Sequence, residues 1–158
     1  MKTIYTLLLA FGLCLTVHSQ SVQNYDTYYN QASSTEKQNI SSFLNGAPHK
    51  LIYDPNQKAV TLYADGNDVK MIEVMNLNGF SQNQVNNNLT AFAAAKMIKI
   101  YINSSTQAST IDLSAFTQLQ YVVFELEASN LVSTVNTIVQ TITLPQQVQV
   151  LYRYQTEM

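Results

Sequence analysis

The chain has 158 residues and a formal net charge of −2 at pH 7, and only 11% of its residues are charged. Binding to phosphate backbones or to anionic lipid relies on clustered Lys and Arg, so this composition argues against nucleic acid as a partner. The length suits one domain with its own hydrophobic core.

Residues 1–19 have the features of a secretory signal peptide. Lys2 is followed by an apolar run over residues 7–17 and then by Ser19. The run is shorter than the roughly 20 apolar residues that a membrane span needs. We therefore expect cleavage after Ser19 and an exported protein that is secreted, periplasmic or associated with the cell surface.

The only cysteine, Cys14, lies inside this predicted leader. A lipid anchor on Cys14 is the alternative to cleavage, but Leu13 stands where that motif requires a small residue. We expect no membrane anchor. Without the leader, the chain keeps no cysteine and only His49 as histidine. Disulfides and a histidine-rich zinc site are thereby excluded.

Residues 20–33 are expected to form a mobile lead-in, followed by one globular domain over 34–158. Ser33 and Glu36 have the spacing of a capping box, which predicts a helix over 34–45. Asn45-Gly46 ends that helix. Three β-like segments follow, joined by turn-rich links, and they predict an antiparallel meander: Leu51–Tyr53, Ala59–Ala64 and Val69–Met75.

From Ser81 onward, helical and strand patterns alternate, which predicts parallel neighbouring strands with right-handed connections. The segments are a helix up to Ala95, a strand Met97–Ile102, a strand Gln120–Leu126, a helix Asn130–Ile142 and a strand Val148–Tyr154. The predicted fold is α/β: a mixed sheet in which an antiparallel N-terminal meander continues into parallel βαβ-type strands, with helices on one face.

An apolar pattern occurs twice, each member of the second copy standing 24 positions after its counterpart. The copies are Leu89, Phe92, Ala95, Ile98, Ile100 and Ile102, and then Leu113, Phe116, Leu119, Val122, Phe124 and Leu126. This spacing resembles leucine-rich repeats, and Asn103 stands where that family often places its asparagine ladder. Glu127 replaces this asparagine in the second copy. The resemblance, over residues 89–154, implies a binding role for the open strand face and no catalysis.

The residues that could carry chemistry fit ordinary structural roles better. Asp65-Gly66-Asn67-Asp68 lacks the further ligands of a calcium loop and indicates a turn. His49 has no acid nearby in sequence, and Asp112 suits a local cap. Glu125 and Glu127 lie two apart on one strand, either as a paired acid site or as a solvated face.

The chain also lacks a nucleophile elbow and a phosphate-binding loop. We therefore expect no catalytic residues, no metal and no cofactor, and the sequence gives an enzyme no support.

Alternation along the strands places one set of side chains opposite the expected core. These predicted binding residues are Met97, Lys99, Tyr101, Tyr121, Glu125, Leu151 and Arg153, aligned so that Tyr101, Glu125 and Arg153 form one row. Met71, Glu73 and Met75 are expected to extend this face. If the face is open, the protein is a small exported domain that binds a protein or a glycan. If the N-terminal segment covers it, the protein is a structural or accessory domain. A small hydrolase is the third hypothesis.

Overall fold

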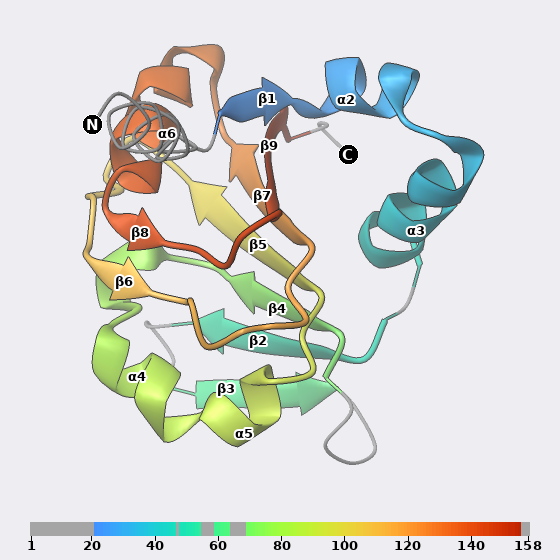
Figure 1. Ribbon diagram of the computed structural model, residues 1–158. Helices are drawn as coiled ribbons and strands as arrows, with labels where there is room; N and C mark the ends of the chain where they lie inside the picture. The colour runs from blue at the N-terminus through green and yellow to red at the C-terminus, as the bar shows by residue number, and fades with distance from the viewer. Residues whose placement is uncertain (1–20, 47, 55–58, 64–68, 156–158) are drawn as a thin grey trace, which may run out of the picture.

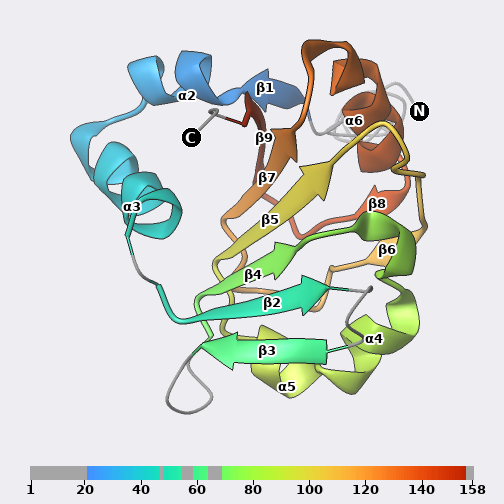
Figure 2. The ribbon, with the colours of Figure 1, turned by 180° about the vertical axis from the view of Figure 1, so that it is seen from behind.

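The computed structural model describes residues 21–46, 48–54, 59–63 and 69–155, so the predicted signal peptide and the turn Asp65–Asp68 lie outside it. A seven-stranded sheet forms the centre of the molecule, in the order β1-β9-β7-β5-β4-β2-β3 (Figures 1 and 2). The strands are β1 (Val22–Asn24), β2 (Lys50–Asp54), β3 (Ala59–Tyr63), β4 (Met71–Val74), β5 (Met97–Ile102), β7 (Tyr121–Leu126) and β9 (Gln149–Tyr154).

The first six strands in this order run parallel to one another, and only the last, β3, is antiparallel to its neighbour β2. The predicted antiparallel meander is therefore wrong, because β4 pairs with β2 in parallel and not with β3. Burial explains the difference. All four residues of β4 are buried, and a strand covered on both faces belongs inside a parallel sheet. The β2–β3 hairpin consequently places β3 at the sheet edge.

Helices lie on both faces of the sheet, whereas the sequence predicted them on one face. On one face are α4 (Gln82–Asn87), α5 (Leu89–Phe92) and α6 (Val132–Val139), whose buried side chains join the larger hydrophobic cluster. On the other are α2 (Tyr25–Gln31) and α3 (Ser34–Leu44), which contribute to a separate, smaller cluster. Figures 1 and 2 show α2 and α3 together beside the β1–β9 side of the sheet.

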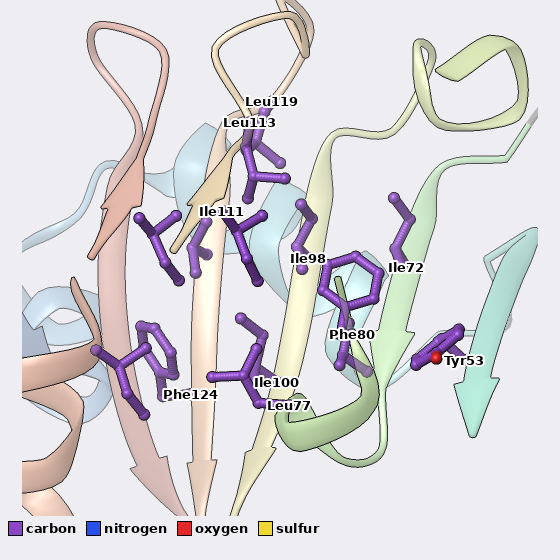
Figure 3. Close-up of a cluster of buried hydrophobic side chains, with 14 of the residues drawn as sticks. Tyr53, Ile72, Leu77, Phe80, Ile98, Ile100, Ile111, Leu113, Leu119 and Phe124 are labelled. Atoms are coloured by element: carbon purple, nitrogen blue, oxygen red, sulfur yellow. The ribbon is translucent and has the colours of Figure 1, made fainter. Parts of the chain in front are cut away.

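The larger cluster contains every apolar position of the two repeat copies except Leu89, which is exposed. Ile98, Ile100 and Phe124 are at most 1% exposed and lie over the sheet together with Phe80 and Ile111 from the connecting segments (Figure 3). The sequence predicted this inward orientation for β5 and β7. Burial of these side chains, at about 25 cal/mol per Å² of apolar surface, is the main stabilising contribution to the fold.

The parallel strands β4, β5, β7 and β9 follow one another in the chain and are also neighbours in the sheet. The segments that connect them contact one another outside the sheet. Two short strands, β6 (Ile111–Asp112) and β8 (Ile142–Thr143), pair in parallel as a second sheet. Asn78 bridges two consecutive connections, since its side chain donates to Ser105 O at 2.9 Å and accepts from Gln107 N at 2.7 Å. Asn103, the expected ladder residue, instead accepts from Ser105 within its own turn.

Within the stretch 20–33, for which the sequence predicted a mobile lead-in, the structure contains β1 and α2. β1 adds to the edge of β9 through three parallel residue pairs, and the Asn24 side chain then caps α2 by accepting from Asp26 N. The predicted capping box of α3 is present between Ser33 and Glu36. α3 ends before Gly46, where a Cβ would stand 2.2 Å from Ser42 O, so the turn requires glycine.

Candidate functional site

The sheet face that carries the predicted binding residues is divided into two parts. Odd-numbered residues of β5 point to this face, and the strand register places Met97 beside Tyr121. These two residues and Leu151 are at most 5% exposed, and they pack in the smaller cluster with Ile40 of α3. Three of the seven predicted binding residues therefore lie beneath the N-terminal helices and not at the surface.

Aromatic contacts hold this covered part together. The ring centroid of Tyr121 lies 6.4 Å from that of Tyr28 in α2 and 6.5 Å from that of Phe43 in α3. Burial is the main cause that raises the pKa of the Tyr28 hydroxyl, with further contributions from the adjacent Tyr121. The covered part is therefore an apolar and aromatic layer without a charged group from the sheet.

Beside the covered part, the same face carries a row of alternating charges. We call it the charged row and define it as Lys50, Glu73, Lys99, Glu125 and Arg153, one residue from each of five adjacent parallel strands. The row contains three of the predicted binding residues, Lys99, Glu125 and Arg153, which makes this part of the face the candidate site.

Four ion pairs join the charged row from end to end. Lys50 Nζ lies 3.2 Å from Glu73 Oε2, and Lys99 Nζ lies 2.8 Å from Glu73 Oε1. Lys99 Nζ is also 3.4 Å from Glu125 Oε2, and Arg153 Nη2 is 2.7 Å from Glu125 Oε1. Each carboxylate therefore lies between two cations, and each carboxylate oxygen has one cationic partner.

Burial differs along the charged row. The side chains of Glu73, Lys99 and Glu125 are 7–9% exposed, whereas those of Lys50 and Arg153 at the two ends are 35% and 23% exposed. The central groups are held in a low-dielectric setting by their neighbours, while both ends are accessible and cationic. An approaching molecule would first meet Lys50 or Arg153.

Lys99 is the central cation, and Tyr101 lies next to it. The Nζ of Lys99 lies 4.8 Å from the centre of the Tyr101 ring, within the range of a cation–π interaction. Burial acts to lower the pKa of Lys99, but Glu73, Tyr101 and Glu125 outweigh it and the pKa is raised. This raised pKa favours the protonated form of Lys99 at neutral pH.

Arg153 connects the charged row to the N-terminal helices. Burial is the main cause that raises the pKa of the Tyr25 hydroxyl in α2; the nearby Tyr29 adds to it, and the charge of Arg153 opposes it. The Nε of Arg153 is buried and has no hydrogen-bond partner among the described residues. This donor is therefore left over after the four ion pairs have formed.

The structure brings together four of the predicted binding residues, namely Lys99, Tyr101, Glu125 and Arg153. The expected register is confirmed, because Tyr101 pairs with Glu125 and Glu125 with Arg153 across β5, β7 and β9. Lys50 was missed. Lys50 stands two residues before Ile52, and Ile52 pairs with Glu73 across β2 and β4. Because the sequence predicted an antiparallel meander, it did not predict this pairing.

The other residues considered for chemistry have local roles or lie apart. Asp112 accepts from Ser114 N at 2.8 Å, as expected for a cap, and hydrogen bonds from the side chain and the backbone of Ser114 lower the pKa of its carboxyl. His49 is exposed, and so is Glu127, whereas Glu125 is buried between its two cations. No group of three His, Cys, Asp or Glu side chains with metal-binding geometry occurs within the described residues.

No family model, curated protein or solved structure matches this chain. Across the part of the chain that the structure covers, every helix is too short or too polar to cross a membrane. The charged row and its geometry are therefore the basis for the functional conclusion.

Proposed function

We propose that this protein is a small exported, non-catalytic domain that binds a partner protein through the charged row and Tyr101. The single observation that carries the proposal is the division of one sheet face: α2 and α3 cover its apolar part, and the charged row continues beyond them with cationic, accessible ends. Aromatic and Arg side chains supply much of the binding energy at protein interfaces.

The residues of the charged row support binding rather than catalysis. Lys99 holds its proton at neutral pH, and both buried carboxylates are engaged by two cations each. A general base must be within reach of a substrate proton and free to accept it. Neither carboxylate meets that condition, so the small hydrolase has no supporting observation.

The complete pairing of both carboxylates also favours a second candidate, a structural or accessory domain in which the charged row only organises the sheet. Buried ion pairs can fix a unique arrangement of strands without binding anything. The two candidates differ in whether another molecule contacts Tyr101.

Site-specific photo-crosslinking in the producing cells separates the two. A photoreactive phenylalanine analogue at Tyr101 should give a discrete cross-linked species. The same analogue at Tyr154 is the matched control, because Tyr154 is exposed, lies at the same end of the sheet and points to the opposite face. Arg153→Gln should reduce the product at Tyr101. Absence of any product, or equal products at both positions, would favour the structural domain.

A further inference from the structure

The charged row has hydrogen-bond donors left over and no free carboxylate oxygen. The two carboxylates offer four oxygens, and each is within 3.4 Å of a cationic nitrogen. On the donor side stand two ammonium groups with three N–H bonds each and one guanidinium with five. Donors therefore outnumber acceptors in the row, and a ligand that brings acceptors would find donors at both ends.

The charges of the row lead to the same class of ligand. Three cations face two carboxylates, so the row by itself carries one positive charge in excess. One excess charge matches one carboxylate. A phosphate dianion would call for more cations or a helix N-terminus, as in known phosphate sites.

Arg153 is the better anchor of the two cationic ends. A guanidinium binds a carboxylate through two parallel N–H bonds, and Glu125 occupies only Nη2. Its Nε is buried without an acceptor among the described residues, which is unfavourable for a charged group. An incoming carboxylate would supply the acceptor that this donor lacks, once rotation of the side chain brings the Nε to the surface. Lys50 presents a flexible point charge without such a fork.

We infer that the Arg153 end of the charged row binds an aspartate or glutamate carboxylate within an acidic segment of the partner protein. This inference rests on the proposed function and specifies the chemistry of its partner. Tyr101 lies on the same face as Arg153, and Glu125 on β7 stands between them, paired with both. The Tyr101 ring offers an aromatic surface to the rest of such a segment.

The chain itself provides a clean probe, because Arg153 is its only arginine. The side-chain Nε–H region of a ¹H–¹⁵N NMR spectrum should therefore contain one arginine signal. Titration of the exported chain with capped hexaglutamate should shift this signal and saturate. Capped hexaglutamine, acetate and inorganic phosphate are the comparison probes, and hexaglutamine should leave the signal in place.

Two variants test which end of the row is responsible. Arg153→Lys keeps the charge and removes the fork, and it should weaken hexaglutamate binding at least about tenfold. Lys50→Gln removes one charge from the other end and should weaken it less than about threefold. Binding of both is followed by calorimetry after circular dichroism has shown a retained fold.

Several results would overturn the inference: an arginine signal that does not respond to hexaglutamate, an equal response to hexaglutamine, saturation by phosphate alone, or equal weakening by both variants. The proposed function fails separately. A crosslink at Tyr101 without a hexaglutamate response means that the partner binds without this carboxylate contact. A hexaglutamate response without any crosslink would support the anion site and contradict the protein-binding role.

Discussion

Lys99 Nζ lies 2.8 Å from Glu73 Oε1, and both side chains are less than one-tenth exposed. Removing two charges from water is costly, and their mutual attraction offsets this cost only when geometry and neighbouring contacts are good. Here Lys99 also contacts Glu125 and the Tyr101 ring, so it serves two carboxylates at once. We therefore expect the stability of the central sheet to depend on this one ammonium group.

Lys99→Met should destabilise the fold by about 3–5 kcal/mol, because it leaves two buried carboxylates without their shared cation. The measurement is the midpoint of urea denaturation at pH 7. Lys50→Met is the matched control: Lys50 is 35% exposed and serves only Glu73, so its loss should cost about 1 kcal/mol or less. Equal losses in the two variants would contradict the central role of Lys99.

The two tyrosines that the sequence placed together on one binding face should behave differently. Tyr121 is 5% exposed and packs against Tyr28 and Phe43, so Tyr121→Ala should cost about 3–5 kcal/mol, as for other buried aromatic residues. Tyr101 is only partly buried, and Tyr101→Ala should cost about 1 kcal/mol, mainly its interaction with Lys99. Thermal unfolding of both variants checks this; similar losses would mean that the division of the face is incorrect.

Local periodicity was sufficient to predict the part of the sheet that β5, β7 and β9 form. Alternating apolar residues gave the bounds of β5, and the 24-residue spacing gave the register that places Ile98 beside Val122. Both signals lie within short segments of the chain. The row from Tyr101 to Arg153 could be predicted for the same reason.

The remaining part of the site depends on pairings between distant segments. Lys50 and Glu73 meet because β4 inserts beside β2, and nothing local distinguishes this from a meander until the burial of β4 is known. The cover on Tyr121 was one of two alternatives that the sequence left open. Tyr25, Tyr28 and Tyr29 stand at i, i+3 and i+4 of α2 and pack against the smaller cluster, but none of them is fully buried, so this stripe alone did not decide between the two.

The fold should lose stability in alkaline solution. Burial acts to lower the pKa of Lys99, but its partners outweigh this and raise it. A raised folded pKa stabilises the fold below the unfolded value, about 10.4 for lysine, and this contribution disappears as the pH rises through the folded pKa. Burial also raises the pKa of Tyr101 and Tyr25, which act in the same direction from about pH 10.

The urea midpoint should therefore be steady from about pH 7 to 9 and fall above about pH 10. Tyr101→Phe, which cannot ionise, should reduce the steepness of this fall. A midpoint that stays constant or rises through this alkaline range would contradict the assignment.

Export makes a separate prediction about the N-terminus. If the leader is cleaved after Ser19, mass spectrometry of exported material should give a chain beginning at Gln20, only two residues before β1. Recovery of a membrane-bound form acylated at Cys14 would contradict it.

The N-terminal cover should open more easily than the sheet beneath it. Ile40 is the only buried residue of α3, and α2 has none, whereas all six residues of β7 are buried. Segments with few buried apolar contacts open locally at a free energy below that of global unfolding. Backbone amides of α2 and α3 should therefore exchange hydrogen well before those of β5 and β7.

Ile40→Ala tests whether this cover is a distinct unit. Loss of its buried side chain, a change that typically costs about 2–5 kcal/mol, should accelerate exchange in α2 and α3 while β5 and β7 keep most of their protection. Phe124→Ala is the matched control, because Phe124 lies in the larger cluster and its loss should accelerate exchange throughout the sheet. If Ile40→Ala instead accelerated exchange equally in α3 and β7, the cover and the sheet would form one cooperative unit.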